Sequence, residues 1–137
     1  MPLITTQGRA NSSTPLPVDA ELLRSFTTVT VTIANGENQS GEIDMHQYTM
    51  MIIHMPAQGW TAADIGFQTS YESGGTFQPL YDDLGNIVMV DGPTSGRNYQ
   101  APPEIAGCGY VKLWSQNGAG VNVNQGGDRT IVVSLKS

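Results

Sequence analysis

The chain has little charge, few basic residues and no long apolar run, and each shortage excludes a class of protein. Asp, Glu, Lys and Arg make up 13% of the 137 residues, against roughly 25% in an average soluble domain. The net charge is −6, which argues against binding to nucleic acid or to anionic membranes, because both require a basic surface. We therefore expect neither nucleic acid nor a membrane among the partners.

Cysteine is nearly absent as well. Cys108 is the only one, so a disulfide-stapled secreted domain is excluded. We expect a buried structural thiol, and a catalytic or subunit-crosslinking role is the less favoured alternative. No apolar run approaches the roughly 20 residues of a membrane-spanning helix. Residues 1–7 lack the basic and apolar segments of a secretion signal, so we expect synthesis in a cytoplasm.

Short alternating segments separated by turn residues are abundant. Between Phe26 and Ile33, apolar residues alternate with threonine, which is typical of a half-buried antiparallel strand. Comparable segments lie at 43–45, 48–55, 65–71, 76–82, 87–90, 98–101, 110–115 and 130–136. The nearly continuous apolar run at 48–55 predicts a strand covered on both faces. The pattern predicts an all-β fold for residues 25–137: a single β-sandwich, jelly-roll-like or immunoglobulin-like, of about eight short antiparallel strands.

Residues 1–24 differ from the rest, because they contain prolines and show no hydrophobic period. We expect an extended N-terminal arm there, either a loose terminus or a segment that becomes ordered on a neighbouring subunit. One helical turn capped by Asp19 is also expected. The apolar residues expected at subunit contacts are Leu3, Ile4, Leu16, Leu22 and Leu23 in the arm, and Met50, Met55 and Trp60 in the sandwich.

No group of residues indicates catalysis, a metal or a cofactor. His46 and His54 lack the further ligands at short spacing that a zinc site requires, and no Gly-x-Ser-x-Gly motif occurs. Asp82 and Asp83 lack the spacing of a calcium loop, so we predict an Asx-type turn in which a side chain binds nearby backbone amides. We expect a protein that is not an enzyme.

The aromatic residues leave an alternative open. A sugar-binding platform needs aromatic rings clustered on the surface, whereas packing inside a small sandwich is the commoner role of such residues. An exposed cluster containing Trp114 or Tyr110 would favour the platform. The candidates are Trp60, Tyr71, Tyr81, Tyr110 and Trp114.

Four segments, Val31–Gly36, Met55–Gln68, Gly75–Asn86 and Asp128–Val133, together resemble small β-sandwich structural proteins encoded in the morphogenesis clusters of tailed phages and prophages. Capsid decoration (cement) proteins are among these proteins. The resemblance spans residues 28–135. It implies a homo-oligomeric virion protein, a dimer or trimer, that is assembled in the bacterial cytoplasm.

On the outer capsid surface such a protein binds the major capsid protein and stabilises the head. The alternative is a tail, baseplate or head-fibre component that binds host-surface carbohydrate.

Overall fold

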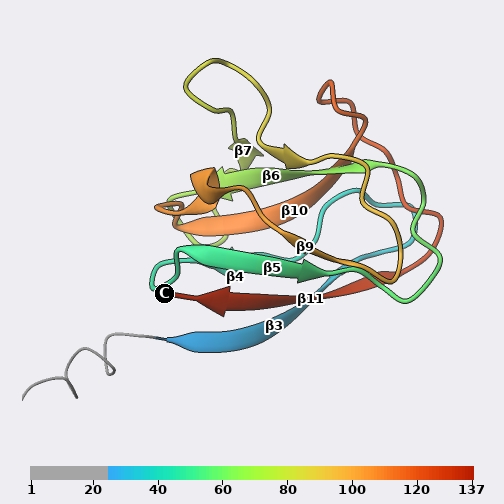
Figure 1. The fold of residues 1–137 in the computed structure, drawn as a ribbon. Coiled ribbons are helices and arrows are strands. Elements are labelled where there is room, and N and C mark those ends of the chain that lie inside the picture. The colour runs from blue at the N-terminus through green and yellow to red at the C-terminus, as the bar shows by residue number, and fades with distance from the viewer. Residues whose placement is uncertain (1–24) are drawn as a thin grey trace, which may run out of the picture.

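Two antiparallel β-sheets packed face to face make up residues 25–137, the part of the chain that the computed structural model describes (Figure 1). The predicted β-sandwich is therefore confirmed. The predicted arm and the Asp19 helical turn lie outside the described residues. The four-stranded sheet has the order β3 (Phe26–Ile33), β11 (Arg129–Lys136), β5 (Met50–His54) and β9 (Asn98–Gln100).

The five-stranded sheet is built around two longer strands in its middle. Its order is β4 (Ile43–Asp44), β10 (Tyr110–Gln116), β6 (Asp64–Ser70) and β7 (Gln78–Pro79), with β8 (Met89–Val90) also paired to β6. The return strand predicted for residues 76–82 is reduced to two residues, since Pro79 has no amide hydrogen to continue a ladder. A 3₁₀ helix covers Pro103–Ile105. Within residues 25–137 no helix is both long and apolar enough to cross a membrane.

The strand order is that of a jelly roll. Strands from the two ends of the described chain pair with one another, β3 with β11 and β4 with β10, and successive strands from β3 to β6 alternate between the sheets. Nested pairing of this kind defines jelly rolls, whereas the immunoglobulin fold groups its strands as ABED and CFG. The order decides between the two topologies that sequence alternation had left open.

The core lies between the sheets and follows the alternation seen in the sequence. The strands of the four-stranded sheet contribute Val31, Ile33, Met51, Ile53, Ile131, Val133 and Leu135, and those of the five-stranded sheet contribute Ile43, Ile65, Phe67, Val111 and Leu113. The expectation that residues 48–55 are covered on both faces is wrong. Only Met51, Ile53 and Met55 are buried there, because no other segment of the described chain covers the outer face of β5.

A buried glutamine ties the sheets and their connections together at one end. Gln125 is 1% exposed, and its side chain forms four hydrogen bonds. Oε1 accepts from the amide of Thr61 at 2.9 Å and from Nε of Arg129 at 3.1 Å. Nε2 donates to the Thr61 carbonyl at 3.1 Å and to Oγ of Ser115 at 2.9 Å. Every donor and acceptor of this side chain is thus satisfied in the interior.

Candidate functional site

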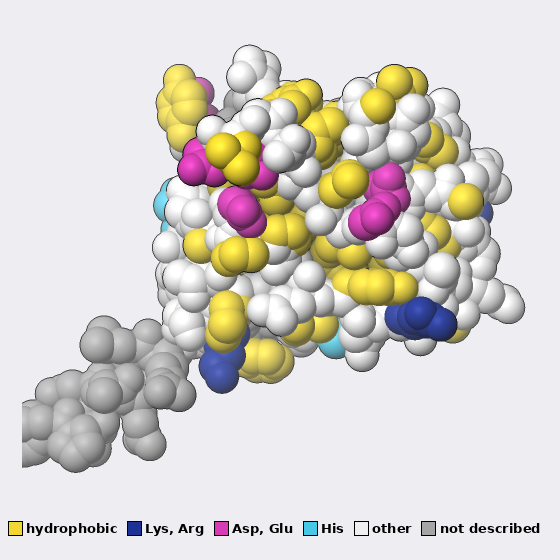
Figure 2. Space-filling view, turned by 45° about the horizontal axis from the view of Figure 1, so that its top comes forward, with side chains coloured by type: hydrophobic (Ala, Val, Ile, Leu, Met, Phe, Trp, Pro, Cys, Tyr) yellow, Lys and Arg dark blue, Asp and Glu magenta, His cyan; other side chains and the backbone are white. Residues whose placement is uncertain are grey.

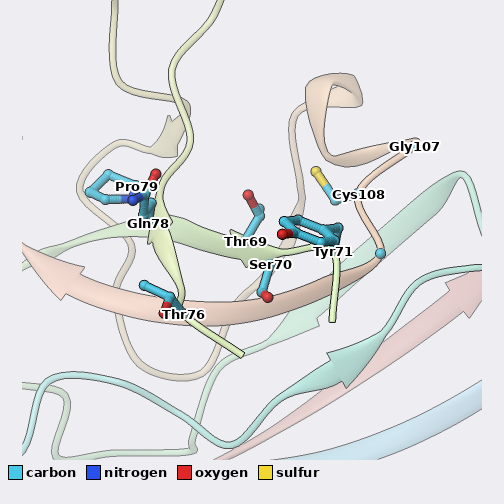
Figure 3. Close-up of a pocket in the computed structure, with 9 residues that line it drawn as sticks. Thr69, Ser70, Tyr71, Thr76, Gln78, Pro79, Gly107 and Cys108 are labelled. Carbon is cyan, nitrogen blue, oxygen red and sulfur yellow. The ribbon is translucent and has the colours of Figure 1, made fainter. Parts of the chain in front are cut away.

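Two adjoining concavities lie where β6 ends and β10 begins. The larger, of about 650 Å³, runs along β6 and β7, and the smaller, of about 450 Å³, is bounded by residues 45–49. Both are also lined by Tyr71 and by Gly107–Gly109. Figure 3 shows Tyr71 and Cys108 at one end of the larger concavity, Gln78 and Pro79 at the other, and Thr69 between them.

Three residues with catalytic potential come near one another around the smaller concavity. Nδ1 of His46 lies 2.8 Å from Oδ1 of Asp44, and Cys108 lines the same concavity as His46. The His46 amide, foremost, and then its ring hold the pKa of Asp44 below its ordinary value. Burial, however, raises the pKa of the Cys108 thiol, which donates to the carbonyl of Glu104 at 3.9 Å. A nucleophilic cysteine needs a lowered thiol pKa, so this environment favours an unreactive, half-buried thiol.

The two histidines also fall short of a metal site. Among residues 25–137 no three His, Cys, Asp or Glu side chains are grouped so that they could hold an ion. Both ring nitrogens of His54 have neighbours within the four-stranded sheet: Oδ1 of Asn98 at 2.9 Å and Oγ of Ser134 at 2.7 Å. His54 thus joins β5 to both of its neighbouring strands.

The predicted Asx-type turn at Asp82 is confirmed. Oδ1 of Asp82 accepts hydrogen bonds from the amides of Leu84 at 2.9 Å and Asn86 at 2.8 Å. These bonds, that of Asn86 foremost, hold the pKa of the Asp82 carboxyl below its ordinary value. The carboxylate is therefore a structural element of the turn.

The aromatic residues do not meet as a surface platform. Trp114 is only 2% exposed, Tyr110 is half-buried with its ring edge-on to His46 at 4.9 Å, and Trp60 packs partly buried against the core. Tyr71 and Tyr81 are exposed. The exposed cluster with Trp114 is thus not formed, because the loop after β10 covers the indole: Nε1 of Trp114 donates to Oδ1 of Asn122 at 2.7 Å.

The residues that the sequence placed at subunit contacts differ in how much of each side chain is exposed. Met50 is 43% exposed on the outer face of β5, whereas Met55 is 7% exposed in the core and offers little surface to a partner. Trp60 is half-buried. Leu3, Ile4, Leu16, Leu22 and Leu23 lie outside the described residues.

Sequence reasoning missed the apolar residues at two loop tips beside the five-stranded sheet. Leu84, in the turn at Asp82, is 81% exposed, and Val121 is 59% exposed. The two loops touch, since a Cβ built on Gly120 would lie 3.3 Å from Cδ1 of Ile87 and 3.9 Å from Oη of Tyr81. We call Tyr81, Leu84 and Val121 the loop surface. The sequence did contain one indication of this exposure: Leu84 is a single apolar residue within a turn of polar residues and glycine.

Charge accompanies the loop surface. Asp82 and Asp83 directly precede Leu84 in the chain. Figure 2, which brings the top of Figure 1 forward, shows hydrophobic side chains between two groups of acidic ones, with the visible Lys and Arg side chains toward the lower and right edges. The loop surface therefore combines exposed apolar side chains with neighbouring acidic ones.

The architecture defines the class of protein as a jelly-roll β-sandwich. Among solved structures the chain is similar to the SPBc2 prophage-derived protein YomS, with a TM-score of 0.53 and 16% sequence identity over 83% of this chain and 95% of the other. At this identity the similarity shows a common fold. No family model and no curated protein matches the sequence.

Proposed function

We propose that the protein is a structural component of a phage particle, and that it acts as a decoration (cement) protein on the assembled major-capsid lattice. The observation that carries the proposal is the fold: a jelly roll matched over most of both chains by a prophage-derived protein. Jelly rolls are common in viral capsid proteins and in lectins, and the prophage origin of the similar structure favours the capsid role.

The surface supports this proposal. The loop surface exposes three large apolar side chains beside acidic residues, and exposed apolar groups with a polar border are typical of protein contacts. The only cysteine is held in an environment that disfavours reactivity. A protein that binds only the assembled shell stabilises it by mass action, so binding alone accounts for capsid stabilisation.

Co-sedimentation with expanded, undecorated capsids of the cognate phage tests the proposal. We expect stoichiometric binding and a higher temperature of capsid disruption. Leu84→Asp should weaken binding at least about tenfold, because it places a charge in the apolar contact. Gln100→Lys, an exposed change on the four-stranded sheet, is the control and should bind normally. Deleting residues 1–20 should also weaken binding if the arm contacts the lattice.

The alternative component of a tail, baseplate or head fibre makes a different prediction. Absence of capsid binding would overturn the decoration proposal. Tyr71, 88% exposed at the rim of the larger concavity, is then the aromatic side chain to test. Glycan binding that is lost in Tyr71→Ala would favour the carbohydrate-binding component.

A further inference from the structure

The edges of the two sheets are protected to very different degrees. A free strand edge presents unpaired amide and carbonyl groups, and proteins usually shorten it or place proline or charge there. β9 has three residues and is followed by Pro102 and Pro103, β7 has two residues including Pro79, and β4 has two residues beside Glu42. β3, in contrast, is eight residues long and contains no proline, glycine or charged residue. It is the outermost strand of the lower sheet in Figure 1.

Among residues 25–137 no strand pairs with the outer edge of β3, which we call its free edge, and the hydrogen bonds identify which groups face it. β3 pairs with β11 in a register that sets Phe26 opposite Lys136, and the amide of Ser137 donates to the carbonyl of Ser25 at 3.0 Å. In an antiparallel pair, hydrogen-bonded and non-bonded residue pairs alternate. The odd-numbered residues of β3 therefore bond to β11, and the amides and carbonyls of Phe26, Thr28, Thr30 and Thr32 point away from it. All four of these residues are exposed.

The sequence of this edge is self-complementary. Residues 28–32 read Thr-Val-Thr-Val-Thr in both directions. In an antiparallel pair of two identical strands centred on Thr30, Thr28 of each strand lies opposite Thr32 of the other, and Val29 lies opposite Val31. Threonine then meets threonine on the outer face and valine meets valine on the core face, and both pairings are favourable.

We infer that the free edge of β3 is the binding site for a second copy of this chain, through antiparallel pairing of β3 with β3 about a two-fold axis at Thr30. The three threonines of each strand that face the edge supply six main-chain hydrogen bonds, and the two four-stranded sheets become one continuous eight-stranded sheet. Val29, which is half-buried in the single chain, gains a valine neighbour. This dimer adds a defined self-association surface to the proposed capsid function and does not depend on it.

Mass measurement without capsids tests the pairing. Sedimentation or light scattering of the full chain should show a mass that rises with concentration from 14.6 kDa towards twice that value. Thr30→Lys sets two like charges opposite each other at the axis and should weaken dimerisation by about tenfold or more. Gln100→Lys adds the same charge at the other edge of the same sheet and should leave dimerisation unchanged. Because Thr30 and Gln100 are both exposed, both variants should fold.

Cross-linking tests the axis. In a Cys108→Ser background, Thr30→Cys places two cysteines opposite each other at about 5.5 Å between Cα atoms, within the range of a disulfide. Under diamide it should form a covalent dimer rapidly. Thr28→Cys should not, because its own copy then lies about four residues, or roughly 13 Å, along the partner strand. A monomer at all concentrations, or equal cross-linking of the two variants, would overturn the inference. Neither result bears on the capsid proposal, which the co-sedimentation experiment tests separately.

Discussion

The two sheets of this protein share one core but treat their outer faces differently. On the four-stranded sheet, burial alternates along β3 and β11, and the outward residues include the exposed threonines Thr28, Thr30, Thr32 and Thr130. On the five-stranded sheet, most of β6 and the second half of β10 are buried on both faces. Among residues 25–137, loops cover the outer face of the five-stranded sheet, whereas the outer face of the four-stranded sheet stays largely open.

The covering layer is built around Trp114. Its indole lies across Gly66, where a Cβ would come within 2.7 Å of Cε3 of the ring. Gln116, 0% exposed on the same outer face, accepts hydrogen bonds through Oε1 from the amides of Gly118 at 2.6 Å and Gly120 at 3.1 Å. The loop is thereby held over the tryptophan, whose indole is buried on the outer face of the sheet.

The largest expected effect comes from removing the buried indole of Trp114. Trp114→Ala should lower the free energy of unfolding by about 3–5 kcal/mol, as other large-to-small core changes do. Chemical denaturation measures the loss. Tyr71→Ala is the control, because Tyr71 is 88% exposed and its loss should cost less than about 0.5 kcal/mol. Equal effects in the two variants would show that the loop does not cover the tryptophan.

Removing the buried glutamine should come next in size. Gln125→Ala leaves the amide and carbonyl of Thr61 without their side-chain partner, and we expect a loss of about 2–3 kcal/mol. Hydrogen exchange should quicken at Thr61 in particular, since its amide bonds to Gln125. Unchanged protection there would contradict the role assigned to the glutamine.

Adding a methyl group beneath the Trp114 indole should lower the free energy of unfolding by somewhat less than the loss of Gln125. Gly66→Ala forces Trp114 or Gln116 to move, so we expect a loss of about 1–2 kcal/mol. Gly41→Ala is the matched control, because a Cβ there meets nothing within 4 Å and Gly41 does not have a positive φ. Thermal melting of the two variants compares them. A melting temperature lower for Gly41→Ala than for Gly66→Ala would refute the packing argument.

The four-stranded sheet should tolerate a substitution on its exposed outer face. Thr28 faces outward from β3 and is exposed, so Thr28→Ala should alter the free energy of unfolding by less than about 0.5 kcal/mol. Denaturation at low protein concentration separates this effect from self-association. A loss as large as that of Gly66→Ala would mean that the open face is packed after all.

The smallest expected effect is a pH dependence of stability that comes from Asp82. The folded pKa of Asp82 lies below its ordinary value of 3.8. A group with a depressed folded pKa stabilises the fold above its unfolded pKa, and this contribution disappears as the pH falls through the folded pKa. Asp82→Asn should therefore be slightly less stable than the parent near neutral pH and equal to it in strong acid. A gap that widens on acidification would contradict the turn geometry.

Much of the fold could be predicted from local sequence, but the site could not. Val29, Val31 and Ile33 alternate with threonine, and this period identified the inward face of β3 correctly. In β10 the same alternation sets Trp114 on the face opposite to Val111 and Leu113, yet an outward residue is exposed only if nothing folds over it. Burial of Trp114 depends on Asn122 and Gly120, in a loop whose sequence does not show which strand it covers.

The three methionines near β5 also show that alternation in the sequence does not predict which side chains are buried. Met50, Met51 and Met55 stand close together in an apolar run, and alternation alone does not reveal which side another segment covers. The structure buries Met51 and Met55 and exposes Met50, because the loops needed to cover the outer face of β5 belong to the other sheet. The Asp82 turn, in contrast, was predictable, since Asx turns form between residues that are neighbours in the chain.

Local sequence was enough to predict the all-β class, the inward face of β3 and the turn at Asp82, because these depend on side-chain period and on contacts a few residues apart. Only the tertiary structure decided the jelly-roll order, the covering of Trp114 and the exposure of the β3 edge. Each of these depends on which distant segments meet, and that is settled by the joint packing of the whole chain.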